Sequence, residues 1–164
     1  FGCPVHSPTP ERPGPWGWAC VGRLHEKNYG CGVRIGYRRF YEVYPHTVCL
    51  SILRLARRHP YKIQRSASYW PGASPSERRE RTADNLRMLL RGLGREIDVP
   101  DVEPDLRACR TFSDLKRVED RVDALLCAWA GLRILDGTFV PYGDGKAAIW
   151  NPGLKDLDDL CDFD

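Results

Sequence analysis

The stretch "VEDRVDALLCAWAGLRI", residues 118–134, decides how the fold is read from this sequence. It belongs to a helix predicted over about 113–135, which the Asp136-Gly137 pair ends. Large side chains along it are expected to fill the core, namely Val122, Leu125, Leu126, Trp129 and Leu132. A neighbouring row of small residues is expected to lie close against a sheet, namely Ala124, Cys127, Ala128 and Gly131. The pattern therefore predicts a buried helix with acidic residues at its rim.

Asp120 and Asp123 are the acidic pair of this helix. Residues three apart lie on the same side of a helix, so the two carboxylates can converge. Carboxylates this close repel each other unless a cation lies between them, and Mg²⁺ takes one or two carboxylates together with phosphate oxygens. The alternative is stabilisation by the helix dipole, worth about 0.3–1 kcal/mol for each acid, with Arg117 and Arg121 as counter-charges. Asp123 lies about two turns into the helix, where the dipole effect has faded, and both interpretations stay open.

A short strand is predicted over "RRFYEVYP", residues 38–45, with Pro45 ending it. Glu42 lies in the middle of it. It either faces solvent from a half-buried strand or supplies a third carboxylate to the same metal site. His46 follows directly and is interpreted as a residue that begins a helix, with proton transfer as the alternative.

The remaining elements follow from periodicity and capping. An amphipathic helix is predicted in "HTVCLSILRLARRH", 46–59, and a second from Ser74 or Ser76 to about Leu93, with Glu77 in its first turn. Two short strands are predicted around the "GDG" turn of 143–145. Prolines and tryptophans within residues 1–30 predict an ordered loop without regular structure.

Composition bounds the class of protein. The 164 residues suit one domain, and 29% charged residues fit a globular chain. No run of about 18 apolar residues is present, so no membrane span is expected. Residues 51–100 hold 11 Lys/Arg against 5 Asp/Glu, so they either face a polyanion or form an ordinary solvated surface. The candidates for nucleic-acid contact in this region are Arg54, Arg57, Arg58, Lys62 and Arg65.

The seven cysteines are an odd number and include no C-x-x-C pair. This usage favours a reduced, intracellular protein, and we expect a cytoplasmic location. A zinc-stabilised binding domain is the alternative. Its ligands would come from the N-terminal set Cys3, His6, Cys20, His25 and Cys31.

Several motifs together resemble one family. "EVYPH", "YWP", "LKRVEDRVDALLCAWAG" and "GDGKAAIW" look like the predicted RNase H-like nucleases of domain-of-unknown-function family 429. The resemblance implies an α/β fold of the ribonuclease H type, with a mixed sheet flanked by helices, in one domain over 1–153 followed by an acidic tail, 154–164. The arrangement is also similar to the RuvC-type resolvases. Carried over by position, their metal ligands correspond to Glu42, Asp120 and Asp123.

The resemblance also implies an activity. We expect a metal-dependent nuclease that uses Mg²⁺ or Mn²⁺ to hydrolyse phosphodiesters of nucleic acid, with an inactive scaffold or nucleic-acid-binding module as the alternative. The fold of this family begins with a strand that bears a catalytic Asp. Residues 1–37 contain only Glu11 and Glu26 as acids, neither in an apolar strand. We therefore expect a chain that lacks the first strands of the fold and is inactive by itself.

Overall fold

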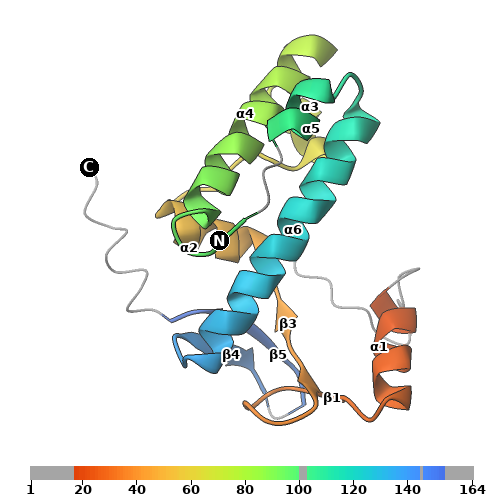
Figure 1. Ribbon diagram of the computed structural model, residues 1–164, viewed down its shortest axis with the longest axis vertical. Helices are drawn as coiled ribbons and strands as arrows, with labels where there is room; N and C mark the ends of the chain where they lie inside the picture. The colour runs from red at the N-terminus through yellow and green to blue at the C-terminus, as the bar shows by residue number, and fades with distance from the viewer. Residues whose placement is uncertain (1–16, 100–102, 145, 154–164) are drawn as a thin grey trace.

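The structure, a computed structural model, describes residues 17–99, 103–144 and 146–153. Three helices, α2, α4 and α6, lie together above a small sheet, and α1 stands beside the sheet (Figure 1). In chain order the elements are α1 (Gly17–Glu26), β1 (Gly30–Cys31), β2 (Arg39–Phe40), β3 (Glu42–Val43), α2 (Pro45–Leu53), η1 (Ile63–Arg65), α3 (Ser66–Tyr69), α4 (Pro75–Leu93), α5 (Glu103–Ala108), α6 (Phe112–Leu135), β4 (Phe139–Gly143) and β5 (Ala148–Pro152).

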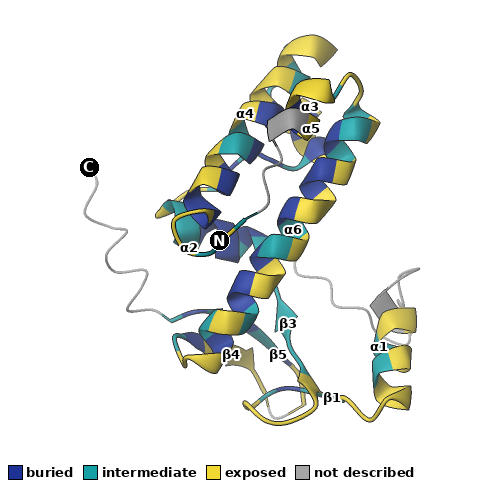
Figure 2. Cartoon of the chain, viewed as in Figure 1, coloured by how far each residue is buried: buried dark blue, intermediate teal, exposed yellow. Residues whose placement is uncertain are grey.

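The core lies where α2, α4 and α6 face one another, and Figure 2 shows the buried stripes of α4 and α6 turned toward each other. These stripes follow the helical repeat of apolar residues. The fully buried side chains from the three helices include Val48, Cys49, Leu86, Leu89, Leu93, Leu115, Val122 and Leu126. This packing fixes the position of α6, which carries the acidic pair.

Both long helices begin with a capping box. The Ser74 hydroxyl accepts the N–H of Glu77, and the Glu77 carboxylate accepts the N–H of Ser74. Thr111 and Asp114 make the same reciprocal pair at the start of α6. Each box satisfies backbone N–H groups that a helix leaves without partners. The predicted starts of both helices are therefore confirmed, the second within a residue.

A three-stranded mixed sheet has the order β3-β5-β4. β3 pairs with β5 in parallel, with Glu42 opposite Ile149, and β4 pairs with β5 antiparallel, with Phe139 opposite Pro152. The predicted hairpin strands around the "GDG" turn are confirmed. The end of α6 packs on this sheet through Trp129, whose ring meets Phe139 edge-on at 5.6 Å. β1 and β2 form a separate parallel pair.

Several predictions about local structure are wrong. The row of small residues on α6 does not lie against the sheet, because Ala124, Cys127 and Ala128 are exposed and an added Cβ at Gly131 would meet nothing within 4 Å. Leu132 is 53% exposed and does not fill the core. Large neighbours in the adjacent stripe offer more apolar area to bury, so they decide which face of the helix turns inward.

Other boundaries differ from the prediction. Residues 17–26 form helix α1 instead of a loop, because the prolines stop at position 15. The predicted 38–45 strand is interrupted at Tyr41, and α2 ends at Leu53 because Arg54 adopts the left-handed conformation, with φ of 52°. The α/β class is confirmed. The expected loop of residues 1–16 and the acidic tail, 154–164, lie outside the described residues. No helix within the described part of the chain is long and apolar enough to cross a membrane.

Candidate metal centre

Three carboxylates meet on α6: Glu119, Asp120 and Asp123. One carboxylate oxygen from each lies within 4.8 Å of the other two. The helix brings them together, because residues three or four apart lie on one side of a helix and Asp123 is three residues from Asp120 and four from Glu119. They differ in burial: Glu119 is buried, Asp123 is half-buried and Asp120 is exposed. The predicted convergence of Asp120 and Asp123 is present, and Glu119 is the third member.

Glu119 is the buried carboxylate, with its side chain 3% exposed. Its Oε2 accepts the backbone N–H of Ile63 at 2.8 Å, and its Oε1 accepts a hydrogen bond from the Lys116 ammonium at 2.9 Å. The Lys62 ammonium is 3.4 Å from Oε1. A buried charge is tolerated only where partners replace water, and here two ammonium groups and an amide do so.

Asp123 is joined to the segment before η1. Its Oδ1 accepts a hydrogen bond of 3.0 Å from the Tyr61 hydroxyl, and its Oδ2 forms an ion pair with Lys62. Tyr61 is fully buried, and burial followed by the nearby Asp123 carboxylate raises its pKa. The phenol therefore stays protonated and acts as a donor. The Lys62 ammonium also lies 4.8 Å from the centre of the Tyr61 ring.

Asp120 occupies the solvent side of the cluster, with its side chain 61% exposed. It is ion-paired with Lys116, four residues earlier. Burial disfavours the charged form of Lys116, but its bonds to Asp120 and Glu119 outweigh that effect and raise its pKa. Lys62 and Lys116 thus both contact Oε1 of Glu119, and each is shared with one aspartate.

A stack of rings leads from the end of β3 to this cluster. The His46 ring stacks on Tyr61 at 5.4 Å and faces Tyr44 at 6.3 Å. His46 is 2% exposed, and neither ring nitrogen has a hydrogen-bond partner in the part of the chain that the structure describes. Burial, followed by the positive charges of Arg58 and Lys62, lowers its pKa to about 4. The neutral ring is therefore a packing element at neutral pH, in agreement with its prediction as a residue at the helix start.

Glu42 is not a member of the acidic cluster found among the described residues. It is half-buried at the first position of β3, and its charge, after burial, raises the pKa of the Cys31 thiol. The structure therefore places Glu42 beside β1, at the start rather than the end of its strand. The expected triad of Glu42, Asp120 and Asp123 is not brought together as one group of ligands here.

The predicted basic residues separate into two groups. Lys62 is held by Asp123 and Glu119, so it is already paired with carboxylates instead of facing a phosphate. Arg54, Arg57 and Arg65 are exposed, and Arg58 is half-buried. The predicted zinc ligands do not gather either: within the described residues, Cys20, His25 and Cys31 form no group of three ligands. Cys3 and His6 lie outside the described residues.

The donor chemistry of the cluster fits a hard divalent cation. Carboxylate oxygens are the ligands that Mg²⁺ and Mn²⁺ prefer, and three of them converge here with one on the solvent side. Carboxylates this close together need positive charge between them, and here the ammonium groups of Lys62 and Lys116 supply it. A metal would have to displace Lys62 or Lys116 from at least one oxygen.

Sequence reasoning missed Glu119, although a signal for it exists. Leu115, Val118, Val122 and Leu126 mark the buried stripe of α6. Glu119 falls within this stripe, four residues after Leu115 and three before Val122. An acid on the apolar side of a helix must have a buried partner, and this position therefore pointed to an ionic cluster.

Comparison with known proteins identifies the family of this chain. The family model described as "Protein of unknown function (DUF429)" matches residues 19–147, which include every member of the cluster and both of its lysines. The chain therefore belongs to the DUF429 family. Neither the curated proteins nor the solved structures gave a match.

Proposed function

We propose that this member of the DUF429 family is a metal-dependent phosphodiester hydrolase of the RNase H-like type that acts on nucleic acid. The observation that supports the proposal is the group of three carboxylates on α6, with ligand oxygens within 4.8 Å of one another. The family match covers the cluster, and the α/β class is compatible with the proposed fold. A metal-ligand role for Glu42 stays a prediction from the resemblance, and the proposed site consists of the carboxylates on α6.

The proposed roles follow from burial. Asp120 is exposed and Asp123 is half-buried, and these two would hold Mg²⁺ or Mn²⁺, while buried Glu119 ties the helix to Ile63 and helps to orient them. The metal would activate water and stabilise the leaving oxygen of the phosphodiester. Tyr61 holds one oxygen of Asp123 in place through its hydroxyl. Lys62, once released, would be positioned to pair with a phosphate oxygen.

A second candidate is a nucleic-acid-binding module without catalysis. Its support is that each of the three carboxylates already has a lysine partner, so none of them needs a metal to be paired. A domain can keep its fold after its site has lost activity.

Cleavage assays separate the two candidates. Labelled single-stranded DNA, duplex DNA, a branched junction and RNA are incubated with the chain and with the complete product of its reading frame, in Mg²⁺, Mn²⁺ or chelator. The hydrolase predicts cleavage by the complete product that needs either metal and disappears in Asp123→Asn but not in Arg117→Ala. Binding without metal-dependent cleavage in all of these tests favours the module, and full cleavage by Asp123→Asn contradicts the proposed site.

A further inference from the structure

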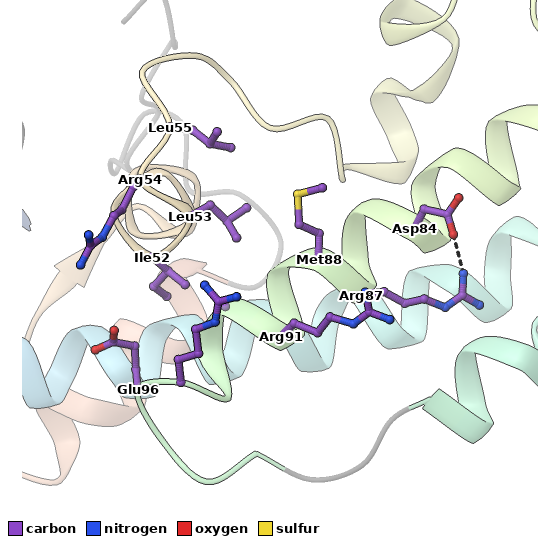
Figure 3. Close-up of a pocket in the computed structure, with 11 residues that line it drawn as sticks. Ile52, Leu53, Arg54, Leu55, Asp84, Arg87, Met88, Arg91 and Glu96 are labelled. Atoms are coloured by element: carbon purple, nitrogen blue, oxygen red, sulfur yellow. Dashed lines mark hydrogen bonds and ion pairs between the residues drawn. The ribbon is translucent and has the colours of Figure 1, made fainter. Parts of the chain in front are cut away.

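A groove separate from the acidic cluster lies between the end of α2 and the second half of α4. It has a volume of about 800 Å³, which is in the range of ligand pockets. One wall is Ile52–Leu55, and the other is formed by α4 residues from Asp84 onward and by Arg95 and Glu96, which follow the helix (Figure 3). Gly92 allows the close approach of these walls, because a Cβ there would lie 2.9 Å from atoms of both Ile52 and Leu53.

The groove carries an excess of positive charge. Four arginines and two acids line it: Arg54, Arg87, Arg91, Arg95, Asp84 and Glu96. Arg87 is paired with Asp84 at 2.7 Å. Arg54, Arg91 and Arg95 have no ion pair with any residue that the structure describes. Three guanidinium groups without carboxylate partners around one hollow indicate an anionic ligand, and guanidinium suits phosphate in particular.

The floor between these charges is apolar. Met88 is 50% exposed, and Figure 3 shows its side chain directed toward the wall that holds Leu53 and Leu55. An exposed thioether beside leucines offers a surface for the face of a ring, and guanidinium planes stack on nucleic-acid bases. A sulfate-like ion would use only the arginines, whereas a nucleotide would use both features.

We propose that this groove binds single-stranded nucleic acid, with phosphates on Arg54, Arg91 and Arg95 and a base against Met88 and Leu55. This inference rests on the proposed function, because the bound strand would be the nucleic acid that the metal site cleaves. Phosphate contacts supply affinity, and base stacking supplies a preference for single strands over duplexes, whose bases are already stacked. Arg54 is the one residue that belongs both to this groove and to the nucleic-acid contacts predicted from sequence.

Fluorescence anisotropy with a labelled 12-nucleotide oligothymidylate tests this proposal. All measurements contain chelator, so no metal held by the acidic cluster contributes to binding. Arg91→Ala with Arg95→Ala should weaken binding at least tenfold. It should also reduce the slope of log K against log salt by about 1.4, at about 0.7 for each lost phosphate contact on a single strand. The matched control is Arg34→Ala with Arg117→Ala, which removes the same charge from exposed positions outside the groove.

Competitors identify the chemistry. Met88→Ala should weaken the affinity for the oligonucleotide several-fold and leave the slope of log K against log salt unchanged. In competition assays with the unchanged chain, unlabelled oligothymidylate should displace the labelled strand better than inorganic polyphosphate, polyglutamate or duplex DNA does. Equal loss in the control pair would show that total charge, not the groove, binds the strand, and would overturn the proposal. Equal competition by polyphosphate or polyglutamate would overturn the assignment of a nucleic-acid ligand. Either failure would leave metal-dependent cleavage untouched, because that depends on Asp123.

Discussion

Tyr61 donates a hydrogen bond of 3.0 Å from its buried hydroxyl to Oδ1 of Asp123, which lies 62 positions later in the chain. The bond joins the segment before η1 to the middle of α6. Lys62, the next residue, pairs with the other oxygen of the same carboxylate. Asp123 is therefore held at both oxygens by two adjacent residues, and its position is set by tertiary structure instead of helix capping.

Tyr61→Phe isolates this bond. The ring stack with His46 is kept, and the hydroxyl alone is removed, so we expect a loss of about 0.5–1.5 kcal/mol in the free energy of unfolding. Urea denaturation measures it. Tyr41→Phe is the control, because among the described residues that hydroxyl bonds only an exposed loop at Gly36. Equal losses in the two variants would show that the Tyr61–Asp123 bond contributes no more to the free energy of unfolding than an exposed hydrogen bond does.

Glu119 and Asp120 are adjacent acids that should respond differently to neutralisation. Glu119→Gln places an amide against two ammonium groups in a buried site, and we expect a loss of about 1–3 kcal/mol. Asp120→Asn removes an exposed ion pair and should change stability by less than about 1 kcal/mol. Thermal melts of both variants check the order. A larger effect at Asp120 would contradict the burial assigned to the pair.

His46 gives the protein a pH dependence whose sign is fixed. Its pKa is about 4 in the folded chain against 6.5 when exposed, so the unfolded state binds the proton first as pH falls. Stability is therefore complete above pH 6.5 and is lost between 6.5 and 4, at up to about 1.4 kcal/mol per pH unit. Burial also lowers the pKa of His59, which acts in the same direction.

His46→Phe keeps a ring against Tyr61 and removes the titrating group. Urea denaturation at several pH values should show a shallower loss between about pH 6.5 and 5, where the His59 contribution remains. At pH 7 we expect stability equal to or above that of the unchanged chain, because neither ring nitrogen has a partner to lose within the described residues. An unchanged slope would contradict the assignment to His46.

Two helical glycines make a matched pair. Gly131→Ala adds a methyl group where nothing lies within 4 Å, so it should raise the free energy of unfolding by about 0.5–1 kcal/mol through helix propensity. Gly92→Ala gains the same propensity but crowds Ile52 and Leu53, at a cost of about 1–3 kcal/mol. Calorimetry should therefore show Tm changes of opposite sign. A stabilising Gly92→Ala would mean that α2 and α4 are not in tight contact there.

The sequence was sufficient to predict the long helices α4 and α6 and the β4–β5 hairpin. Ser74 with Glu77 is a local capping signal, and the "GDG" turn between apolar residues indicates two strands. The identity of the third acid depends on which face of α6 is buried, and Ala124 and Cys127 lie on the exposed side against expectation. The Lys62 pairing joins residues about 60 positions apart, and no local pattern contains it. Tertiary contacts of this kind could not be predicted from local sequence patterns.

The lysine pairing gives a prediction specific to a cation site. Lys62→Met removes the ammonium that balances Asp123 and Glu119, while the long side chain still covers Tyr61. The acids then lack one counter-charge, and we expect divalent metal to stabilise the variant more than it stabilises the unchanged chain. Differential scanning calorimetry with and without Mn²⁺ measures this. If Mn²⁺ raises the Tm of neither protein, the cluster is an ionic network of structural importance only.

Direct measurement of Mn²⁺ binding by electron paramagnetic resonance tests the central claim, that the α6 carboxylates form a metal site. Free Mn²⁺ is titrated into the unchanged chain, into Asp123→Asn and into Asp105→Asn, which neutralises an exposed acid outside the cluster. We predict one saturable site in the unchanged chain and in Asp105→Asn, and affinity at least about tenfold weaker in Asp123→Asn. Equal binding by all three proteins, or no saturable binding by the unchanged chain, would contradict the account.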